Sequence, residues 1–314
     1  MQYFIQQFMA TTVKNSVGIA SLFVNGILSI KPLANLAKNQ ARKMMIKRAE
    51  KMGVPWRKEV EELRQHDWSK NLAKVQNSQI KYPDYYLTSF HAYEQGNLNW
   101  DAALELEVAA KAVHATIWKD AGALGDFKLR ESYHEIFKNQ LPDVPSNILD
   151  VGCGVGLSSF ALQEIYPKSE ITGLDLSPYF LAVAHYHCEL QQGKINWVHA
   201  AAESTGLPNN YFDLVSIFLV CHELPQSATR QIIQEVRRLL RPGGYLAIMD
   251  MNPKSEAFVK MPPYILTLLK STEPYLDEYF TLNIEQTLID VGFNTPTISL
   301  NSPRHRTIVA QLRV

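Results

Sequence analysis

The sequence predicts an α/β fold in which a doubly wound, mostly parallel seven-stranded sheet with an antiparallel last strand follows a helical N-terminal region. Three observations support this prediction. From residue 147 onward, short apolar runs alternate with stretches of helical spacing. A glycine-rich turn follows the first run directly. The last two runs are separated by only six residues, which is too few for the crossover that parallel strands require.

The first five apolar runs are rich in Ile, Val and Leu, as parallel strands buried on both faces are. They span residues 147–151, 171–175, 195–199, 214–220 and 245–249. Apolar residues at helical spacing from Ile232 to Leu240 predict a helix that ends at the Arg-Pro-Gly-Gly segment of residues 241–244. The runs at 297–300 and 307–312 are expected to close the sheet as an antiparallel hairpin.

Charge is divided unevenly along the chain, although its 31 basic and 31 acidic residues balance. Residues 1–60 contain ten Lys or Arg and two Glu, a net charge of +8, so residues 61–314 carry −8. Apolar positions at helical spacing between residues 19 and 30 precede a basic segment at 38–51. These patterns predict a basic, amphipathic helical N-terminal region over residues 1–60.

Three interpretations of residues 1–60 remain open: peripheral contact with an anionic membrane, a helix packed on the rest of the protein, and a transit peptide. The uncharged stretch at 15–30 is too short and too polar to span a bilayer. Three cysteines without a CxxC pair are typical of a reduced, intracellular protein. We therefore expect a cytoplasmic protein, membrane-peripheral if this region binds lipid and plastid if it is a transit peptide.

Residues 61–145 are predicted to form a helical cap or lid, with a long helix over 99–118. An aromatic, turn-rich segment before that helix supplies Tyr85, Tyr86, His91 and Tyr93. We expect these side chains, together with Tyr264 of an insertion at 262–282, to cover the substrate; ordinary helical packing is the alternative. Prolines at 142 and 145 mark the boundary with the last domain, residues 146–314.

The most specific motif is the glycine turn that runs from Asp150 to Gly156 with the sequence DVGCGVG. Glycines allow a sharp turn and the close approach of a ligand. Its GxGxG spacing differs from that of pyrophosphate-binding turns, and the carboxylate of Asp150 suits a ligand that carries ammonium and sulfonium groups. Asp175 ends the next run 23 residues after Gly152. That offset is close to the ~20 residues at which an acidic side chain meets ribose hydroxyls.

In this order the motifs resemble those of class I S-adenosylmethionine-dependent methyltransferases of the small-molecule type, related to quinone-biosynthesis and sterol methyltransferases. The resemblance covers residues 146–314 and implies a Rossmann-like methyltransferase fold. The preceding helical region is similar to that of uncharacterised plant and cyanobacterial members. Further segments that carry the resemblance are GLDLSP at 173–178, LP at 207–208, YFDLV at 211–215, LLRPGG at 239–244 and VGF at 291–293.

The resemblance implies S-adenosyl-L-methionine as cofactor and S-adenosyl-L-homocysteine as product. It places the glycine turn against the methionine and ribose, Asp150 near the amino group and Asp175 on the ribose hydroxyls. The family commonly has Asp where this chain has Ala201, so Glu203 or a water is expected to contact the adenine amino group. The implied cofactor-binding residues are Asp150, Gly152, Cys153, Gly154, Gly156, Asp175, Leu176, Ser177, Ala202, Glu203 and Phe218.

His222 is the candidate catalytic residue, because the resemblance places the segment after the fourth run beside the sulfonium. Histidine titrates near neutral pH and could accept a proton from a hydroxyl or an acidic carbon. It could equally shape the substrate pocket, donate a hydrogen bond there, or be structural. No metal site is expected, since His185 and His187 would point to different faces of a helix.

The expected function is in-line methyl transfer to a small and fairly apolar molecule, with the reacting atoms aligned at about 3–3.5 Å and water excluded. One alternative is a nucleic-acid or protein methyltransferase that uses the basic N-terminal arm. The acidic body and the lack of a correctly placed NPPY box argue against nucleic acid. Another alternative is a cofactor-binding scaffold without catalysis. The acceptor atom and the oligomeric state do not follow from the sequence.

Overall fold

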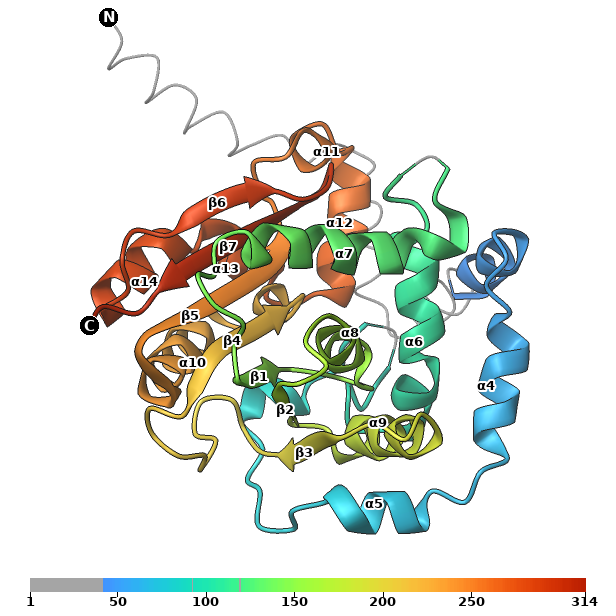
Figure 1. Ribbon diagram of the computed structural model, residues 1–314. Helices are drawn as coiled ribbons and strands as arrows, with labels where there is room; N and C mark the ends of the chain where they lie inside the picture. Colours follow the sequence, from blue (N-terminus) through green and yellow to red (C-terminus); the bar gives the residue numbers. More distant parts are fainter. Residues whose placement is uncertain (1–41, 92, 119) are drawn as a thin grey trace, which may run out of the picture.

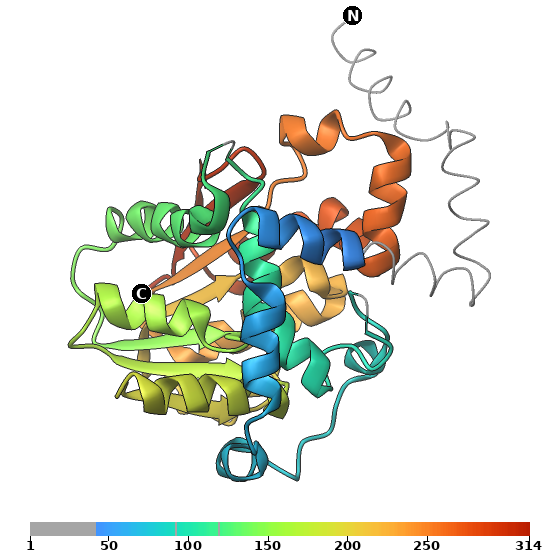
Figure 2. The same cartoon turned by 90° about the vertical axis from the view of Figure 1, so that its right-hand side faces the viewer.

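The computed structural model describes residues 42–314 except 92 and 119. The predicted apolar stripe at 19–30 and the transit-peptide interpretation therefore lie outside the described residues. In the described part, a central sheet is covered by helices on both faces, and the N-terminal helices pack along one side (Figures 1 and 2).

The sheet has seven strands in the order β3-β2-β1-β4-β5-β7-β6, and β7 is antiparallel to both of its neighbours. This confirms the predicted mostly parallel sheet with an antiparallel last strand. The order reverses between β1 and β4, and open α/β sheets bind ligands at the carboxyl ends of strands at such a point. The strands are β1 Asn147–Val151, β2 Glu170–Asp175, β3 Ile195–His199, β4 Phe212–Phe218, β5 Leu240–Met251, β6 Thr297–Leu300 and β7 His305–Gln311.

Helices follow β1, β2 and β4, as the sequence predicts, whereas β3 passes to β4 through residues 200–211 without a helix. Several helices begin at side-chain caps. Ser177 accepts a hydrogen bond from the N–H of Phe180 at the start of α9, and Asn99 caps α6 in the same way. A helix also covers residues 42–51. The other helices are α4 Trp56–Arg64, α5 Ser69–Val75, α6 Trp100–His114, α7 Gly125–Lys138, α8 Leu157–Ile165, α9 Pro178–Leu190, α10 Gln226–Leu239, α11 Glu256–Val259, α12 Pro263–Thr272, α13 Leu276–Thr281 and α14 Ile284–Val291, with short 3₁₀ helices η1 Asp84–Leu87, η2 Gly122–Leu124 and η3 Cys221–Glu223.

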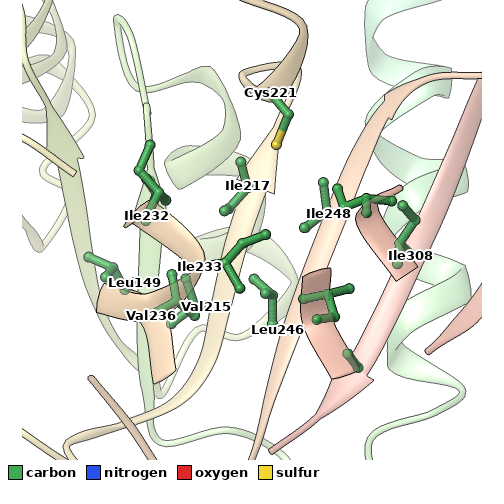
Figure 3. Packing of buried hydrophobic residues seen from close by; sticks show 14 of the residues in the cluster. Leu149, Val215, Ile217, Cys221, Ile232, Ile233, Val236, Leu246, Ile248 and Ile308 are labelled. Carbon is green, nitrogen blue, oxygen red and sulfur yellow. The ribbon is translucent and has the colours of Figure 1, made fainter. Parts of the chain in front are cut away.

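Two hydrophobic clusters fill the layers on either side of the sheet. In one, α10, α13 and α14 pack on residues such as Leu149, Val215 and Ile248 (Figure 3). In the other, α7 and α8 pack on Ile148 and Leu214. Neighbouring residues of one strand thus enter opposite clusters, which explains why each strand is a continuous apolar run.

The N-terminal helices form a third cluster on the outer side of α9. Trp56 and Val60 of α4 pack with Leu104 of α6, and Phe180 of α9 joins them. Ile46, in the helix over residues 42–51, is buried in the same cluster. The first described residues are therefore part of the packed structure. No helix among the described residues is long and apolar enough to cross a membrane.

One predicted boundary was wrong. A turn was expected at residues 241–244, whereas α10 passes directly into β5 at Leu240. The buried Leu240 pairs with Phe212 of β4, so the strand begins one residue after the helix ends. Gly243 has a φ of +78°, and the pairing with β4 is irregular there. The Arg-Pro-Gly-Gly segment therefore forms an irregularity within β5 instead of a turn.

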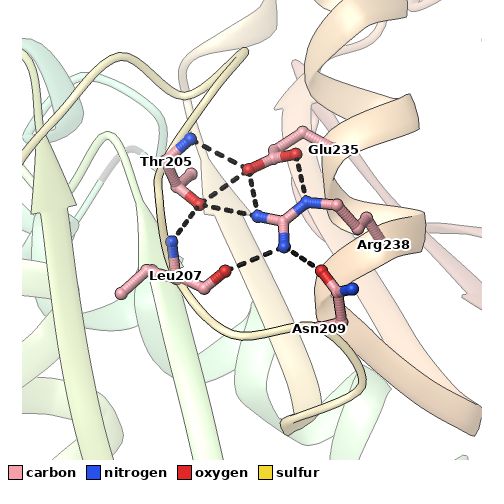
Figure 4. A network of polar contacts seen from close by, with 5 residues as sticks. All are labelled: Thr205, Leu207, Asn209, Glu235 and Arg238. Atoms are coloured by element: carbon pink, nitrogen blue, oxygen red, sulfur yellow. Dashed lines mark hydrogen bonds and ion pairs between the residues drawn. The ribbon is translucent and has the colours of Figure 1, made fainter.

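A polar network fixes the connection between β3 and β4 to α10 (Figure 4). Glu235 accepts hydrogen bonds from the backbone N–H and the hydroxyl of Thr205, at 2.9 and 2.7 Å. The guanidinium of Arg238 binds the same carboxylate and donates to the carbonyl of Leu207 at 2.8 Å. This network anchors the segment that carries Ala202 and Glu203.

Candidate functional site

The glycine turn lies at the carboxyl end of β1, where all three glycines have positive φ angles of +68°, +55° and +90° for Gly152, Gly154 and Gly156. L-residues with side chains rarely adopt this conformation. The backbone N–H groups of Gly152 and Cys153 donate to the carbonyl of Leu174 at 2.8 and 3.0 Å. The turn is thereby tied to β2.

Neighbouring side chains leave no room for a Cβ at Gly152 or Gly156, whereas Gly154 has space for one. A Cβ on Gly152 would lie 2.5 Å from a methyl group of Val220, and one on Gly154 would reach only Leu106 of α6 at 3.5 Å. A Cβ on Gly156 would lie 2.8 Å from the indole of Trp197. The same indole would be 2.5 Å from a Cβ on Gly173 of β2.

Asp175 ends β2 and links the glycine turn to α9. Its Oδ2 accepts the N–H of Gly154 and its Oδ1 the N–H of Ser177, both at 2.8 Å. The residue is 6% exposed, and burial raises its pKa to about 6 although these hydrogen bonds act in the opposite direction. Each oxygen keeps a further lone pair that can accept a hydroxyl.

Asp150 is fully buried at the end of β1. Its Oδ2 accepts hydrogen bonds from the hydroxyls of Ser158 and Ser159 on α8, each at 2.6 Å. Its Oδ1 is buried without a hydrogen-bond partner among the described residues. Burial raises the pKa of this carboxyl to about 6 against the effect of the two serines. An unmatched carboxylate oxygen beside the glycine turn is suited to a cationic ligand group.

The aromatic segment reaches the edge of the site through η1. The hydroxyl of Tyr85 donates to Oε1 of Glu203 at 2.5 Å, while Oε2 of Glu203 is buried and unpartnered among the described residues. Tyr86 lies near Asp175 and Glu223, and burial and these carboxylates raise its pKa. Ala202, next to Glu203, is half-buried, and Leu176 is buried directly after the end of β2.

His222 lies on η3, at the carboxyl end of β4, and is 5% exposed. Its Nδ1 donates to Oδ1 of Asp250, the penultimate residue of β5, at 2.7 Å. Leu219, between β4 and η3, has a φ of +58°, a strained conformation for a residue with a side chain. The next residue, Val220, fills the space beside Gly152 that a Cβ there would need.

Two further acidic residues lie close to His222. Nε2 of His91 is 3.0 Å from Oε1 of Glu273, and the N–H of His91 donates to the carbonyl of Thr272 at 3.0 Å. Glu223 is half-buried on η3, and burial raises its pKa although His91 and His222 lower it. Glu223, Glu273 and Asp250 were not among the site residues predicted from the sequence. Nothing in the local sequence indicates the position of Glu273.

The structure brings Tyr85, Tyr86 and His91 to the predicted site but places other predicted side chains elsewhere. Tyr93 donates to Glu105 of α6 at 2.6 Å. Tyr264 is 46% exposed on α12. Phe218 is buried on the α7 side of the sheet, where the guanidinium of Arg130 lies 4.3 Å from its ring centre.

The sequence of this chain is similar to those of known methyltransferases. A model described as a methyltransferase domain matches residues 148–244. The chain is 33% identical over 129 residues to a demethylmenaquinone methyltransferase of Listeria welshimeri, covering 40% of this chain and 54% of that protein. It is 30% identical over 192 residues to a ubiquinone biosynthesis O-methyltransferase of Aromatoleum aromaticum, covering 57% and 77%. The chain thus spans about half the length of the Listeria relative.

Solved structures share the fold at low sequence identity. Phosphoethanolamine N-methyltransferase 2 of Haemonchus contortus, in complex with S-adenosyl-L-methionine, matches with a TM-score of 0.51 and 15% identity, covering 68% of this chain and 60% of that chain. A Nostoc punctiforme protein described provisionally as an O-methyltransferase matches with a TM-score of 0.53 and 17% identity, covering 81% and 72%. The chain belongs to the class I S-adenosylmethionine-dependent methyltransferases.

Proposed function

We propose that this protein transfers a methyl group from S-adenosyl-L-methionine to a small-molecule acceptor. One observation carries the proposal: two buried carboxylates, Asp150 and Asp175, flank a glycine turn at the carboxyl ends of β1 and β2. Burying two acidic groups is costly unless a ligand of complementary charge or hydrogen bonding compensates them. A cationic amino acid joined to a ribose diol provides both.

The residues present fit this cofactor. Oδ1 of Asp150 is buried and lacks a partner among the described residues, so an ammonium group would satisfy it. Asp175 already holds the N–H groups of Gly154 and Ser177, so its carboxylate is oriented before a ribose arrives. The glycine turn exposes backbone where a side chain would block the ligand.

Each chain segment would have a distinct role in catalysis. When bound, the cofactor supplies an electrophilic methyl group on a sulfonium. The glycine turn and Asp175 would hold its ribose end, while Glu203, held by Tyr85, would lie at the adenine edge. The η1 segment and the contact between His91 and Glu273 would exclude water from the acceptor side.

A small-molecule acceptor agrees with the names of the relatives, which are quinone-pathway methyltransferases. Those names do not fix the acceptor of this chain. The acceptor that we propose is a fairly apolar small molecule. Labelled cofactor should be incubated with cell extract, which is then separated into lipid, nucleic-acid, protein and small polar pools. Label in nucleic acid or protein alone would contradict a small-molecule acceptor.

Cofactor binding can be tested with two matched aspartates. Asp175→Asn should weaken S-adenosyl-L-methionine binding at least tenfold in calorimetric titration. Asp213→Asn is the control, because Asp213 likewise accepts two backbone N–H groups, from Ser146 and Asn147, but at the opposite end of the sheet. Equal cofactor affinity in both variants would refute the assignment of Asp175.

Contact with an anionic membrane is a separate proposal. The helix over residues 42–51 exposes Lys43, Lys47, Arg48 and Lys51. Deleting residues 1–60 would also remove buried Ile46 and Trp56 and so disturb the fold. Reversing the charge of Lys43, Lys47 and Lys51 is the cleaner change and should reduce flotation with anionic liposomes. Unchanged flotation would contradict this contact.

A further inference from the structure

His199 is the last residue of β3, and both of its ring nitrogens contact backbone groups. The N–H of Asn77 is 2.9 Å from Nδ1, and the carbonyl oxygen of Leu176 is 3.1 Å from Nε2. A backbone N–H can only donate a hydrogen bond, and a carbonyl can only accept one. Nδ1 is therefore free of a proton and Nε2 carries one. The two contacts define one tautomer of a neutral imidazole.

These two backbone groups belong to segments that are far apart in the sequence. Leu176 directly follows Asp175, the last residue of β2. Asn77 lies in the connection between α5 and η1. The ring of His199, which is 5% exposed, thus joins that connection to the end of β2.

Apolar and polar contacts together hold the segment of residues 76–87 against the sheet. Ile80 and Tyr85 are partly buried against the hydrophobic cluster on the α10 side. Among the described residues, the polar contacts of this segment with the sheet and its connections are made by His199 and Glu203. Loss of the histidine contact would therefore leave the first half of the segment without a polar attachment to the sheet.

The 76–87 segment borders the proposed cofactor site. Its Tyr86 lies near Asp175, and burial and the charge of that carboxylate raise the pKa of the tyrosine. Tyr82 stacks on Tyr86, with ring centres 6.3 Å apart, and its hydroxyl is 3.4 Å from Nε2 of His199. Contacts thus lead from His199 through two tyrosine rings to the carboxylate that is proposed to bind the ribose.

We propose that His199 is a positioning residue, which fastens the 76–87 segment over the cofactor as a neutral imidazole and releases it when the ring gains a second proton. The inference rests on the proposed binding of S-adenosyl-L-methionine and gives that site an acid-sensitive gate. A protonated Nδ1 would point its N–H at the N–H of Asn77, and two donors cannot share a hydrogen bond. The segment then moves away from the edge formed by Tyr85 and Glu203, and the cofactor leaves faster.

The surroundings of His199 favour the neutral ring. Burial lowers the pKa of His199 from its ordinary value of 6.5, although the hydrogen bond to Leu176 acts in the opposite direction. Its ionisable neighbours are Tyr82, Asp175 of β2, which is opposite in register, and Lys74 of α5, which is paired with Glu189. The open form binds a proton more readily than the closed form, so acid favours opening. Closure is complete above pH 6.5 and weakens as the pH falls below it.

The first experiment measures hydrogen exchange of the Asn77 amide by NMR in the full chain without cofactor. In wild-type protein its protection factor should fall by up to about tenfold per pH unit below pH 6.5, because each opening takes up one proton. His185→Gln is the control, since His185 also contacts an N-terminal helix, through Asn71 at 3.3 Å, and should leave this profile unchanged. A protection factor that does not vary between pH 7.5 and 5 would overturn the gate.

Two substitutions of His199 separate its two contacts. In His199→Asn, the amide oxygen takes the place of Nδ1 and accepts the N–H of Asn77 without titrating. In His199→Gln, the longer amide takes the place of Nε2 and donates to Leu176 but leaves that N–H unpaired. Protection of the Asn77 amide should stay at the wild-type level in His199→Asn and be lower by about tenfold or more in His199→Gln at pH 7.5. Equal protection in the two variants would overturn the role of Nδ1.

The second experiment measures release of S-adenosyl-L-methionine by stopped flow at pH 7.5, where Asp150 and Asp175 are ionised. His199→Gln should speed release by about threefold or more, because the opening of a covering segment limits the release of a bound molecule. His199→Asn should release the cofactor at the wild-type rate. Equal rates in the two variants would overturn the positioning role.

Failure of this inference can be distinguished from failure of the proposed function. The exchange experiment needs no cofactor and therefore tests the gate by itself. If wild-type protein does not bind S-adenosyl-L-methionine in calorimetry, the methyl-transfer proposal fails. If it binds the cofactor but both His199 variants release it at the wild-type rate, cofactor binding stands and the gate is refuted.

Discussion

Cofactor binding should depend on pH through the two buried carboxylates. Asp150 and Asp175 must be ionised to receive a cationic ligand and ribose hydroxyls, yet burial raises the pKa of each to about 6. Protons therefore compete with the cofactor as the pH falls through 6. Because the free protein takes up protons that the complex lacks, affinity must decrease toward acid pH.

The magnitude follows from these two pKa values. At pH 5, a carboxyl with a pKa of 6 is about nine-tenths protonated, so a single required carboxylate weakens binding about tenfold relative to pH 7. If both carboxylates must ionise, the loss approaches about 100-fold, which corresponds to about 3 kcal/mol. The slope of log Kd against pH thus counts the carboxylates involved.

Calorimetric titration between pH 7.5 and 5, with circular dichroism to confirm folding, provides the assay. Ser159→Ala should move the loss of affinity to higher pH, because the hydroxyl of Ser159 lowers the pKa of Asp150. Ser169→Ala, which removes a hydroxyl bound to the carbonyl of Pro145, is the control and should leave the profile unchanged. An affinity that stays constant from pH 7.5 to 5 in folded protein would refute this account of both aspartates.

Three further predictions concern stability and the adenine edge. Gly154→Ala should lower Tm by about 2–8 °C, because alanine is strained in the left-handed backbone conformation of this residue. Gly152→Ala should lower Tm by more, because its Cβ would also lie 2.5 Å from Val220. Equal losses of Tm in the two variants would contradict the added clash at Gly152. Arg238→Ala should cost about 0.5–1.5 kcal/mol in urea unfolding, since half-buried partners of its guanidinium lose their hydrogen bonds; an unchanged midpoint would count against the network. Tyr85→Phe should speed cofactor dissociation in stopped-flow measurements by freeing Glu203, and an unaltered rate would exclude that role.

The order of elements was predictable because each depends on local sequence. Buried parallel strands must be apolar on both faces, so runs such as 147–151 stand out without knowledge of their partners. Boundaries set by pairing were not predictable in this way. The start of β5 at Leu240 depends on Phe212, which lies 28 residues earlier. The local Arg-Pro-Gly-Gly signal indicated a turn instead.

The cofactor side of the site was predictable to the extent that it is encoded in contiguous motifs. Asp150, the glycine turn and Asp175 end adjacent strands, so their proximity follows from the sheet. The acceptor side is assembled from distant segments. The contact of His91 with Glu273 joins residues 182 positions apart, and that of His222 with Asp250 joins two strand ends. Such pairs depend on tertiary packing that no local pattern reports.

The indole of Trp197 occupies the space left open by Gly156, at the start of α8, and by Gly173, within β2. The last glycine of the motif is therefore needed by the protein's own packing, whether or not a ligand is bound. In related sequences, a larger residue at Gly156 or Gly173 should occur only with a smaller residue in place of Trp197. The packing of Trp197 therefore requires glycine at these two positions as much as a bound cofactor does.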